Sequence, residues 1–554
     1  MGSSLQSVFN LQQALLVNQA ALNVIGNNVA NVNTAGYTKE TVNIEENSLS
    51  PEGSPSASNT ASLAGVKISS VSRDRDTYLD TMYRNENTSQ SYYNELNTNG
   101  TSIENITNEL SNSGINSALS SFYSAASTLS QNPTDKSIRN NFIQSAQSVA
   151  SEFNSTSSSL TDLRTSLIGN LTDTNTLQTS KLATTCTALN NDLSQLAQVN
   201  QSLTTSSGTN NSLLDQRDKL LDDISKYVPI TTTLSPNGTA TINTGSVTLV
   251  NSTQQAASFS ITASTDASNP ATIQVLDSNN NVINSNANAM MGNGQIGAIL
   301  QIGGYDSTSS SLSIGGVLNS LNTMARSFAQ SVNDLQTSST TDNSGNVTQA
   351  VGLNSTGTAL APPTTDPATG LIDPENENNS IFVYQDGQNM VDGNANGNAA
   401  TDETADYQNL TAANITVNST IVNNPYDVAA ATVIYPYATG ITTSQLSGTG
   451  DGSNALAISN LSSTGLSSLG GLTTEDYLSG AVTTIGSQVA GLSTSYDTAS
   501  ATAAQTQTNR QSTGGVSLDE ELTNLTVFQR TYEAAAQVMS DINTSLQKIL
   551  SIAS

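Results

Sequence analysis

Few residues of this sequence have the type and spacing to do chemistry, and a glycine pattern is the first that matches a known site. Gly292, Gly294 and Gly297 fit G-x-G-x-x-G, in which glycines let the backbone approach a dinucleotide pyrophosphate. That site needs a preceding strand and an acidic residue about 20 positions later. The sequence has neither at this place, because no acid stands near position 317. We therefore expect these glycines to form the turn into a helix that begins near Ile296.

A second pattern is that of a calcium-binding loop. Its matching positions are Asp392, Asn394, Asn396, Gly397 and Glu403. Such a loop needs a helix on each side and several carboxylate oxygens, but residues 381–391 have the pattern of a strand and a turn. Only the first and last matching positions are carboxylates, so an ordinary asparagine- and glycine-rich turn is favoured and calcium binding stays open.

The residues that most catalytic sites use are missing. The sequence has no His, no Trp and one Cys, Cys186. Without His there is no Ser-His-Asp or Cys-His catalysis, and a single Cys forms neither an intrachain disulfide nor a thiolate zinc cluster. Cys186 stands on the apolar face of a predicted helix, so we expect it to be buried and unreactive. We expect no catalytic residue, cofactor or metal, and a hydrolase within residues 340–480 is the weakest alternative.

The charge balance excludes further classes of protein. The 554 residues include 16 Lys and Arg against 44 Asp and Glu, a net charge of −28, and only 11% of residues are charged. Nucleic acids and anionic membranes are bound by clustered cations, so neither is an expected partner. No apolar run approaches the roughly 18 residues that span a bilayer, and the N-terminus lacks the basic start of a secretory signal peptide.

Both ends of the chain carry apolar residues at alternating intervals of four and three, the pattern of a helix with one narrow apolar face. The N-terminal run is Leu11, Leu15, Leu22, Ile25, Val29 and Val32, with Asn18 in its one gap. The C-terminal run is Phe528, Tyr532, Ala535, Met539, Ile542, Leu546 and Ile549, and Leu518, Leu522 and Leu525 lie upstream of it. A single striped helix cannot bury such a face alone. The two runs are either core helices of a globular domain or helices that pair with each other and with other subunits.

The middle of the chain alternates between helical and strand-like patterns. A helical stripe predicts a rod over residues 161–207, continuous if Gly169 is tolerated inside it. Residues 230–289 show short apolar alternations, with a hairpin signal at Asn237–Gly238. A helix returns at 294–336, residues 337–480 are polar with short strand-like pieces, and helical spacing resumes near Asp476.

This order predicts an α+β multidomain protein. Its long terminal and central helices form coiled-coil-like layers built from both chain ends, and antiparallel β-domains are inserted between them. The expected units are a terminal helical assembly domain (1–50 plus 515–554), a helical rod domain (51–229 plus 292–336 plus 480–514), an inserted β-domain (230–291) and a second inserted β-rich domain (337–479).

Residues 22–39 resemble the N-terminal signature of the bacterial flagellar rod, hook and hook-associated proteins. The matching positions are Asn27, Asn28, Ala30, Asn31, Asn33, Thr34, Gly36 and Tyr37, while Ala35 stands where the family usually has Pro. Glycine and asparagine tolerate the left-handed conformation that ends a helix. Three further segments resemble the proteins of the hook–filament junction within that family: 213–221 (LLDQRDKLL), 516–525 (VSLDEELTNL) and 528–538 (FQRTYEAAAQV).

The resemblance implies a structural subunit that joins hook to filament and has no catalytic activity. It implies export through the flagellar type III channel without a cleaved signal peptide, and an extracellular location at the junction. Implied partners are sister subunits in a ring, the hook protein on one side, a second junction protein on the other and a dedicated export chaperone. The alternatives left open are a hook or distal-rod subunit and, from a different class, an extracellular β-rich adhesin.

The same resemblance places the assembly interface on the terminal stripes. Gly36 and Tyr37 are expected to fix the turn after the first helix. The full expected interface is Leu11, Leu15, Leu22, Ile25, Asn28, Asn31, Gly36, Tyr37, Leu518, Leu522, Phe528, Tyr532, Met539, Ile542 and Leu546.

Overall fold

The structure is a computed structural model of the chain. It describes residues 2–46, 65–107, 114–170, 173–206, 210–262, 271–304, 312–337, 339–341, 347–352, 380–384, 407, 409–435, 445–446 and 450–553.

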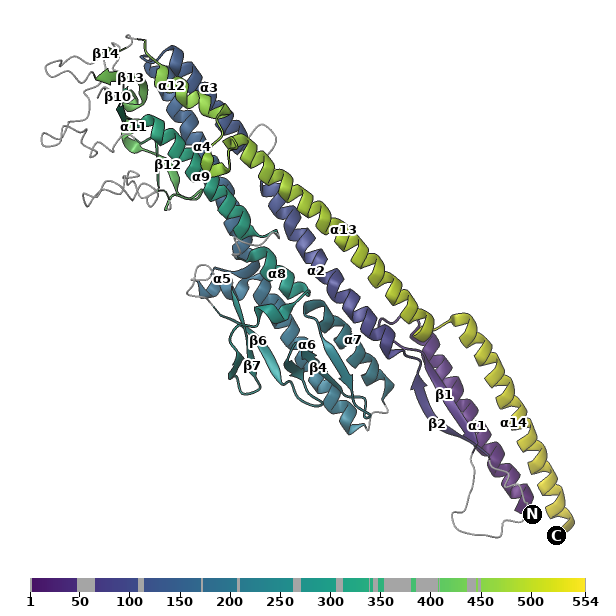
Figure 1. Ribbon diagram of the computed structural model, residues 1–554. Helices are drawn as coiled ribbons and strands as arrows, with labels where there is room; N and C mark the ends of the chain where they lie inside the picture. The colour runs from purple at the N-terminus through teal and green to yellow at the C-terminus, as the bar shows by residue number, and fades with distance from the viewer. Residues whose placement is uncertain are drawn as a thin grey trace.

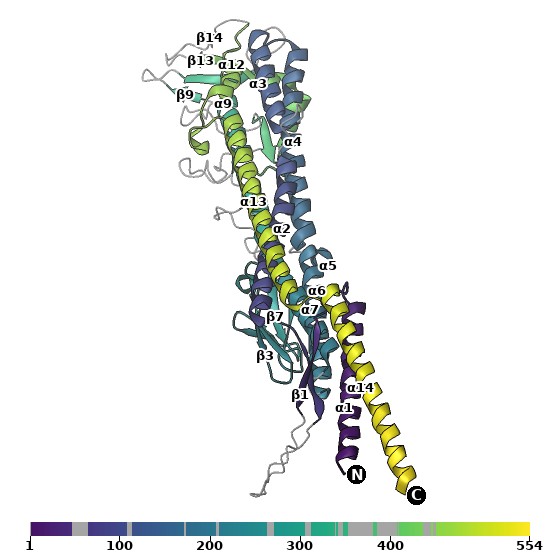
Figure 2. The ribbon, with the colours of Figure 1, turned by 90° about the vertical axis from the view of Figure 1, so that its right-hand side faces the viewer.

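The molecule is elongated, and both chain ends lie at the same tip (Figures 1 and 2). Helix α1 (Gly2–Ala30) runs away from this tip, and α14 (Leu518–Ala553) returns to it alongside. The antiparallel ribbon of β1 (Glu40–Glu46) and β2 (Val66–Arg73) also packs on α1. We call these four elements the terminal unit. They confirm that one layer of the fold is built from both ends of the chain.

Two long helices continue the molecule beyond the terminal unit. Helices α2 (Thr77–Thr107) and α13 (Thr474–Gly514) lie side by side and lead to the far end. The far end is a bundle of α3 (Ile115–Gln131), α4 (Lys136–Ile168), α9 (Ile314–Gln336) and α12 (Ser453–Asn460). Its core is a cluster of buried aromatic rings: Phe122 lies 5.0 Å from Phe142, and Phe328 lies 4.9 Å from Phe382, between ring centroids.

A lobe of helices and strands lies beside the lower half of α2 (Figure 1). Its helices are α5 (Thr174–Thr179), α6 (Lys181–Thr205), α7 (Asn211–Tyr227), the 3₁₀ helix η1 (Asn288–Met291) and α8 (Gln295–Gly303). Its two antiparallel sheets are β3 (Thr231–Leu234), β4 (Ala240–Thr244) and β5 (Val247–Val250), and β6 (Ala257–Thr262), β7 (Thr272–Asp277) and β8 (Val282–Asn284).

The turn predictions in this lobe are confirmed. Strands β3 and β4 pair through the Asn237–Gly238 hairpin, where Gly238 has φ +80°. Gly292 has φ +50°, and Gly294 caps the start of α8. The G-x-G-x-x-G pattern is thus a turn into a helix.

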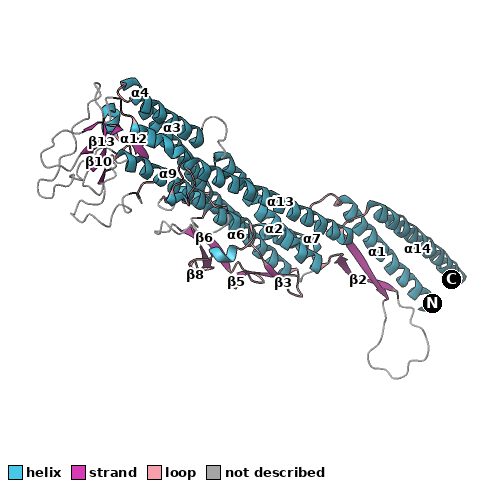
Figure 3. Cartoon of the chain, turned by 45° about the horizontal axis from the view of Figure 1, so that its top comes forward, coloured by secondary structure: helices cyan, strands magenta, loops and turns pink. Residues whose placement is uncertain are grey.

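The far end also carries small sheets next to the helical bundle. One is ordered β14-β13-β10-β9 and the other pairs β11 with β12 (Figure 3). Their strands are β9 (Ser339–Thr341), β10 (Val347–Gly352), β11 (Phe382–Tyr384), β12 (Ile415–Val417), β13 (Ala429–Tyr435) and β14 (Gln445–Leu446). Two short helices, α11 (Ser419–Asn423) and η3 (Pro425–Asp427), connect β12 to β13, and η4 (Leu461–Ser463) and η5 (Ser467–Leu469) lie between α12 and α13. The calcium-loop pattern at 392–403 lies outside the described residues.

The prediction of one continuous helix over residues 161–207 is wrong. Helix α4 ends at Ile168 because Gly169 takes the positive φ of +79°, which favours glycine. A Cβ at this position would stand 2.4 Å from the Cα of Leu177, so the chain folds back tightly here. Asp173 and Ser180 then cap two new helices, α5 and α6, with their side chains.

The predicted stripe on α6 is buried as expected. Leu182, Leu189, Leu193 and Leu196 are fully buried, and Cys186 among them is 3% exposed. Burial raises the pKa of the Cys186 thiol to about 12, so the group stays protonated and unreactive at neutral pH.

Buried or half-buried asparagines close the edges of several strands. Asn200 and Asn190 of α6 each accept from and donate to the backbone of one strand residue, Ala240 and Phe259. Asn333 of α9 does the same to Phe382 and also accepts from the Ile381 amide. A side-chain amide that offers one donor and one acceptor replaces a neighbouring strand. This pairing gives the asparagine-rich composition a structural role.

Candidate functional site

The candidate site is the terminal unit, which begins with a helix free of charged residues. The residues of α1 that the structure buries are Val17, Asn18, Ala21, Ile25 and Asn28. The predicted positions Leu11, Leu15 and Leu22 are only half-buried. The prediction missed Val17 and Ala21 because apolar residues cover a wide sector of this helix. Their spacing of four before Ile25 is the signal that identifies them.

Helix α14 covers less of its apolar surface. Phe528, Met539, Ile542 and Leu546 are half-buried, and the only extensive packing of this helix among the described residues is against α1. Five large apolar residues are between 38% and 55% exposed, and we call them the exposed set of α14: Leu518, Leu522, Val527, Tyr532 and Val538. On α1, Phe9 and Leu16 are 52% and 59% exposed. The helix pair therefore leaves apolar surface for further contacts.

Asn28 ties the turn after α1 to the start of α14. Its Oδ1 accepts from the Tyr37 hydroxyl (2.8 Å) and the Glu40 amide (3.0 Å). Its Nδ2 donates to the Glu40 carbonyl (2.9 Å) and to Glu521 Oε2 (3.1 Å). Burial, followed by the nearby carboxylates of Glu40, Asp215 and Glu521, raises the pKa of Tyr37. The phenol thus remains a hydrogen-bond donor at physiological pH.

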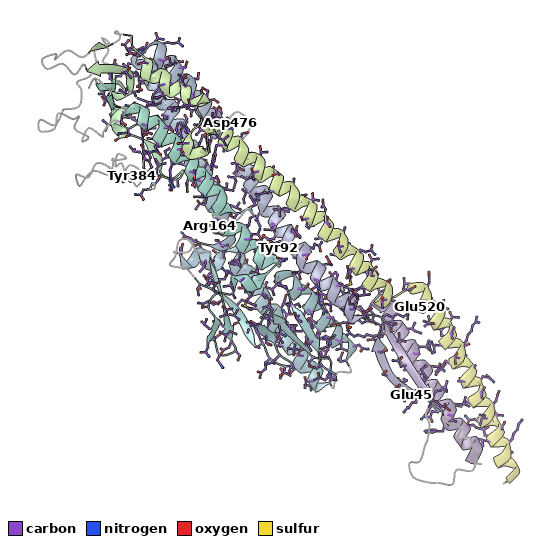
Figure 4. The ribbon with its side chains drawn as sticks, viewed as in Figure 1. Glu45, Tyr92, Arg164, Tyr384, Asp476 and Glu520 are labelled. Atoms are coloured by element: carbon purple, nitrogen blue, oxygen red, sulfur yellow. The ribbon has the colours of Figure 1, made fainter. Side chains whose placement is uncertain are left out.

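The chain turns between these contacts. Gly36 takes φ +85°, and the Asn31 side chain donates to the Asn27 carbonyl and accepts from the Thr34 hydroxyl. Lys39 then reaches α14, with its Nζ 2.9 Å from Glu520. Figure 4 labels Glu520 near the start of α14. Acidic residues at the start of α14 also suit the positive end of the helix dipole.

Behind the terminal unit lies a cluster of arginines and aspartates that sequence reasoning did not find. We call it the joint cluster. Its members are Arg73 at the end of β2, Arg75 in the following link, Asp80 and Arg84 on α2, Asp215, Arg217, Asp218 and Asp222 on α7, and Arg510 on α13. The cluster holds five of the 16 cationic residues of the chain.

Asp218 is the centre of the joint cluster. It is 2% exposed, and its oxygens lie 2.6 Å from Arg217, 2.9 Å from Arg73 and 3.2 Å from Arg75. Burial alone raises the pKa of this carboxyl, but the surrounding guanidinium groups outweigh burial, so the pKa lies below its ordinary value. Asp218 therefore stays ionised down to acid pH.

The 213–221 segment supplies Asp215, Arg217 and Asp218 to this cluster. Its alternation of acidic and basic residues between leucine pairs, together with Arg73 and Arg75 ahead of a helix, is the sequence signal that was available. Only the folded topology shows that these segments meet. The described residues contain no group of acidic or cysteine side chains arranged to hold a metal ion, and none of the described helices is long and apolar enough to span a bilayer.

The two ends of the chain pair at one tip of an elongated molecule and leave apolar side chains exposed there. These features indicate a structural protein that assembles with other molecules. Residues 101–351 match the family of the flagellar hook-associated protein FlgK helical domain. Residues 10–38 match the flagella basal body rod protein family, and residues 508–552 match the C-terminal family of the flagellar basal body rod FlgEFG proteins.

The chain is also similar to individual flagellar proteins and to one solved structure. The chain is 35% identical to flagellar hook-associated protein 1 of Bacillus subtilis (strain 168) over 243 residues, 43% of this chain and about half (46%) of that protein. It is 25% identical to flagellar hook-associated protein 1 of Escherichia coli (strain K12) over 98% of this chain and 99% of that protein. The flagellar hook junction protein FlgK of Burkholderia pseudomallei superposes with a TM-score of 0.49 and 15% identity, over 79% of this chain and 100% of that chain.

By these matches the chain is similar to flagellar hook-associated protein 1 from several bacteria. That likeness supports a structural role in the flagellum for this chain, and not an enzymatic one.

Proposed function

We propose that this chain is the subunit that joins the flagellar hook to the filament, and that its terminal helices drive assembly. The observation that carries the proposal is the exposed set of α14, a helix that packs extensively only on α1 among the described elements. Apolar area removed from water contributes about 25 cal/mol per Å². Neighbouring copies that cover Leu518, Leu522 and Tyr532 therefore supply the free energy of assembly.

The expected interface residues divide into two groups under this proposal. Half-buried residues such as Leu22, Phe528 and Ile542 hold α1 and α14 together, and the exposed set contacts sister subunits. Asn28, Asn31, Gly36 and Tyr37 shape the turn that fixes where α14 begins against α1.

The proposed partners follow from the position at a junction. Sister subunits form a ring, with the hook protein on one side and a second junction protein on the other, and a dedicated chaperone guides export. The proposed route is the flagellar type III channel without a cleaved signal peptide. The absence of disulfide pairs in a chain with one Cys suits passage of an unfolded chain.

The domain division that fits this function assigns assembly to a terminal helical assembly domain, residues 1–50 with 515–554. A helical rod domain (51–229, 292–336 and 480–514) carries two outward insertions, the β-domain at 230–291 and the β-rich domain at 337–479.

A hook or distal-rod subunit is the second candidate, because both terminal matches carry a basal body rod description. Hook subunits build long tubes, whereas a junction subunit occupies one short zone. Immunogold labelling of this chain on intact flagella separates the two candidates: a label restricted to the hook–filament boundary supports the junction, and a label along the hook overturns it.

A test of the terminal interface places one charge in each helix, Leu22→Asp and Ile542→Asp. Both variants should keep the helical content of the rod but fail to attach filaments when they replace the natural protein in a motile strain. Thr544→Asp adds the same charge at an exposed position of α14 outside the exposed set and serves as the control. Normal filaments and swimming in both the Leu22→Asp and the Ile542→Asp variants would refute the proposal.

A further inference from the structure

We propose that the joint cluster orients the terminal unit on the rod, with Asp215 and Asp218 as the positioning residues. The consequence for assembly rests on the function proposed above, whereas the geometry of the joint does not.

The covalent connection between the terminal unit and the rod is thin. The chain crosses between them at residues 74–76, from β2 to α2, and at residues 515–517, from α13 to α14. The two crossings touch, since a Cβ on Gly514 would stand 2.4 Å from the Asp74 carbonyl oxygen. The Lys39 amide donates to the Gly514 carbonyl, and the Asp74 amide donates to the Lys39 carbonyl, both at 2.9 Å. Gly514 ends α13 and Gly515 begins the second crossing. Because glycine tolerates many backbone conformations, this sequence has little intrinsic preference for one direction of α14 relative to α13.

Apart from the backbone hydrogen bond between Lys39 and Gly514, the polar contacts from the terminal unit to the rod domain converge on one helix, α7. Arg73 Nη1 lies 2.7 Å from Asp215 Oδ1, and Arg73 Nη2 lies 2.9 Å from Asp218 Oδ2. The Thr38 amide donates to Asp215 Oδ2 at 3.4 Å, and Asn211 Nδ2 donates to the Val71 carbonyl at 3.3 Å. Asp215 therefore holds both the turn after α1 and the end of β2.

The rod side of the cluster is fixed independently. Arg84 of α2 pairs with Asp222 of α7 at 2.9 Å, and Arg510 of α13 pairs with Asp222 at 2.9 Å and with Asp80 at 3.0 Å. These pairs hold α2, α7 and α13 together without any residue of the terminal unit. Asp218 then links this frame to Arg73 and Arg75.

Ion pairs suit this task better than an apolar contact. Apolar burial is nondirectional, whereas guanidinium–carboxylate pairs fix the angle at which two groups meet. The cluster is largely buried, so salt screens its pairs less than exposed ones. A chain with few cations concentrates them where the direction of its assembly helices is set.

The experiment measures the distance across the joint by pulsed electron spin resonance. Cys186 is buried, so two introduced cysteines take the labels: Thr498→Cys on α13 and Thr531→Cys on α14, both exposed. At 1.5 Å rise per residue the labels lie roughly 40–50 Å apart if the helices continue in line. The unsubstituted joint should give one narrow distance distribution.

Asp215→Asn should broaden that distribution at least twofold while helical content is unchanged, and Asp215→Glu should keep it narrow. The matched control is Asp223→Asn, on the same helix, which removes a carboxylate paired with Lys219 and Lys226 outside the joint. Asp218→Asn should broaden the distribution further. If Asp218→Asn does not fold, Asp215→Asn alone tests the proposal. An unchanged distribution in folded Asp215→Asn overturns the proposal.

Incorporation into flagella separates this proposal from the function. Asp215→Asn should be incorporated at least threefold less than Asp223→Asn, and a broad distribution with normal incorporation overturns the positioning role. Leu522→Asp, in the exposed set of α14, should leave the distance unchanged and block incorporation. Normal incorporation of Leu522→Asp counts against the terminal interface and leaves the distance measurement as a test of the joint.

Discussion

Helices α6 and α14 carry the same kind of apolar stripe, with intervals of four and three, but the molecule treats them differently. Helix α6 buries ten of its 25 residues, with α7, α8 and the strand layer packed around it. Helix α14 has 36 residues and buries only Glu521 among the side chains that the structure describes. One stripe is covered within the chain, and the other is covered on one side only.

The difference shows what a stripe in a sequence means. It predicts a helix with an apolar face that must be covered, but it does not say whether the neighbour lies in the same chain. The neighbour of α6 is present in the fold, and Leu193 is fully buried. Leu522, which lies just upstream of the alternating stripe of α14, is 53% exposed. Substitutions at these two leucines therefore test whether α14 has its neighbour in another molecule.

The largest effect is expected for Leu193→Asp. A carboxylate forced into the closed face of α6 should lower the free energy of unfolding by about 5 kcal/mol, because it finds no partner there. Urea unfolding followed by circular dichroism measures this loss. Leu193→Met, which nearly conserves volume, is the control and should cost less than about 1.5 kcal/mol. Equal stability of the Asp and Met variants would contradict the closed packing of α6.

A smaller loss is expected at the buried asparagines, and here too the two regions differ. Asn333→Ala leaves the Ile381 and Phe382 amides and the Phe382 carbonyl without their partner, which should cost about 3 kcal/mol of overall stability. Asn28→Ala breaks the four hydrogen bonds of a similar residue, but those hold only the terminal unit.

Hydrogen exchange with mass spectrometry distinguishes these two outcomes. Asn333→Ala should speed exchange in α9 and β11, and Asn28→Ala should speed it only in α1, β1 and α14. The same result for both variants would show that the terminal unit and the rod unfold together.

The lone thiol gives a third, pH-dependent comparison. The pKa of Cys186 is raised to about 12 in the fold, so above the ordinary thiol pKa only the unfolded chain loses this proton. The free energy of unfolding should therefore fall as pH rises, and the thiol should make it about 2 kcal/mol lower at pH 10 than at pH 7. Cys186→Ala should lack this component, and the difference between the two urea titrations separates the contribution of the thiol from that of the tyrosines.

In a Cys186→Ala background, Leu522→Cys should react with thiol reagents at once. A slow reaction at 522 would show that α14 is covered.

The sequence allowed the covered stripe, the hairpin at Asn237–Gly238 and the pairing of the two chain ends to be predicted, because each depends on residues close in sequence or on one regular period. The break at Gly169 was missed because a glycine inside a helical pattern is compatible with either outcome. The joint cluster was missed for a stronger reason. Arg73, Asp218 and Arg510 are separated by hundreds of positions, and the crossing of β2, α7 and α13 exists only in the fold.

The smallest effect on stability belongs to Leu522→Asp, which makes it the sharpest test of the comparison. Its side chain is largely in water in the single chain, so the free energy of unfolding should change by no more than about 0.5 kcal/mol. In an assembly the same carboxylate would lie against apolar side chains of a sister subunit, and that burial is costly. Incorporation into flagella should therefore fall at least tenfold while the urea midpoint of the monomer stays the same. Thr523→Asp, the next residue and also exposed, should leave both measurements unchanged. If Leu522→Asp is incorporated normally, the stripe on α14 is not covered by another molecule, and its likeness to α6 is one of pattern alone.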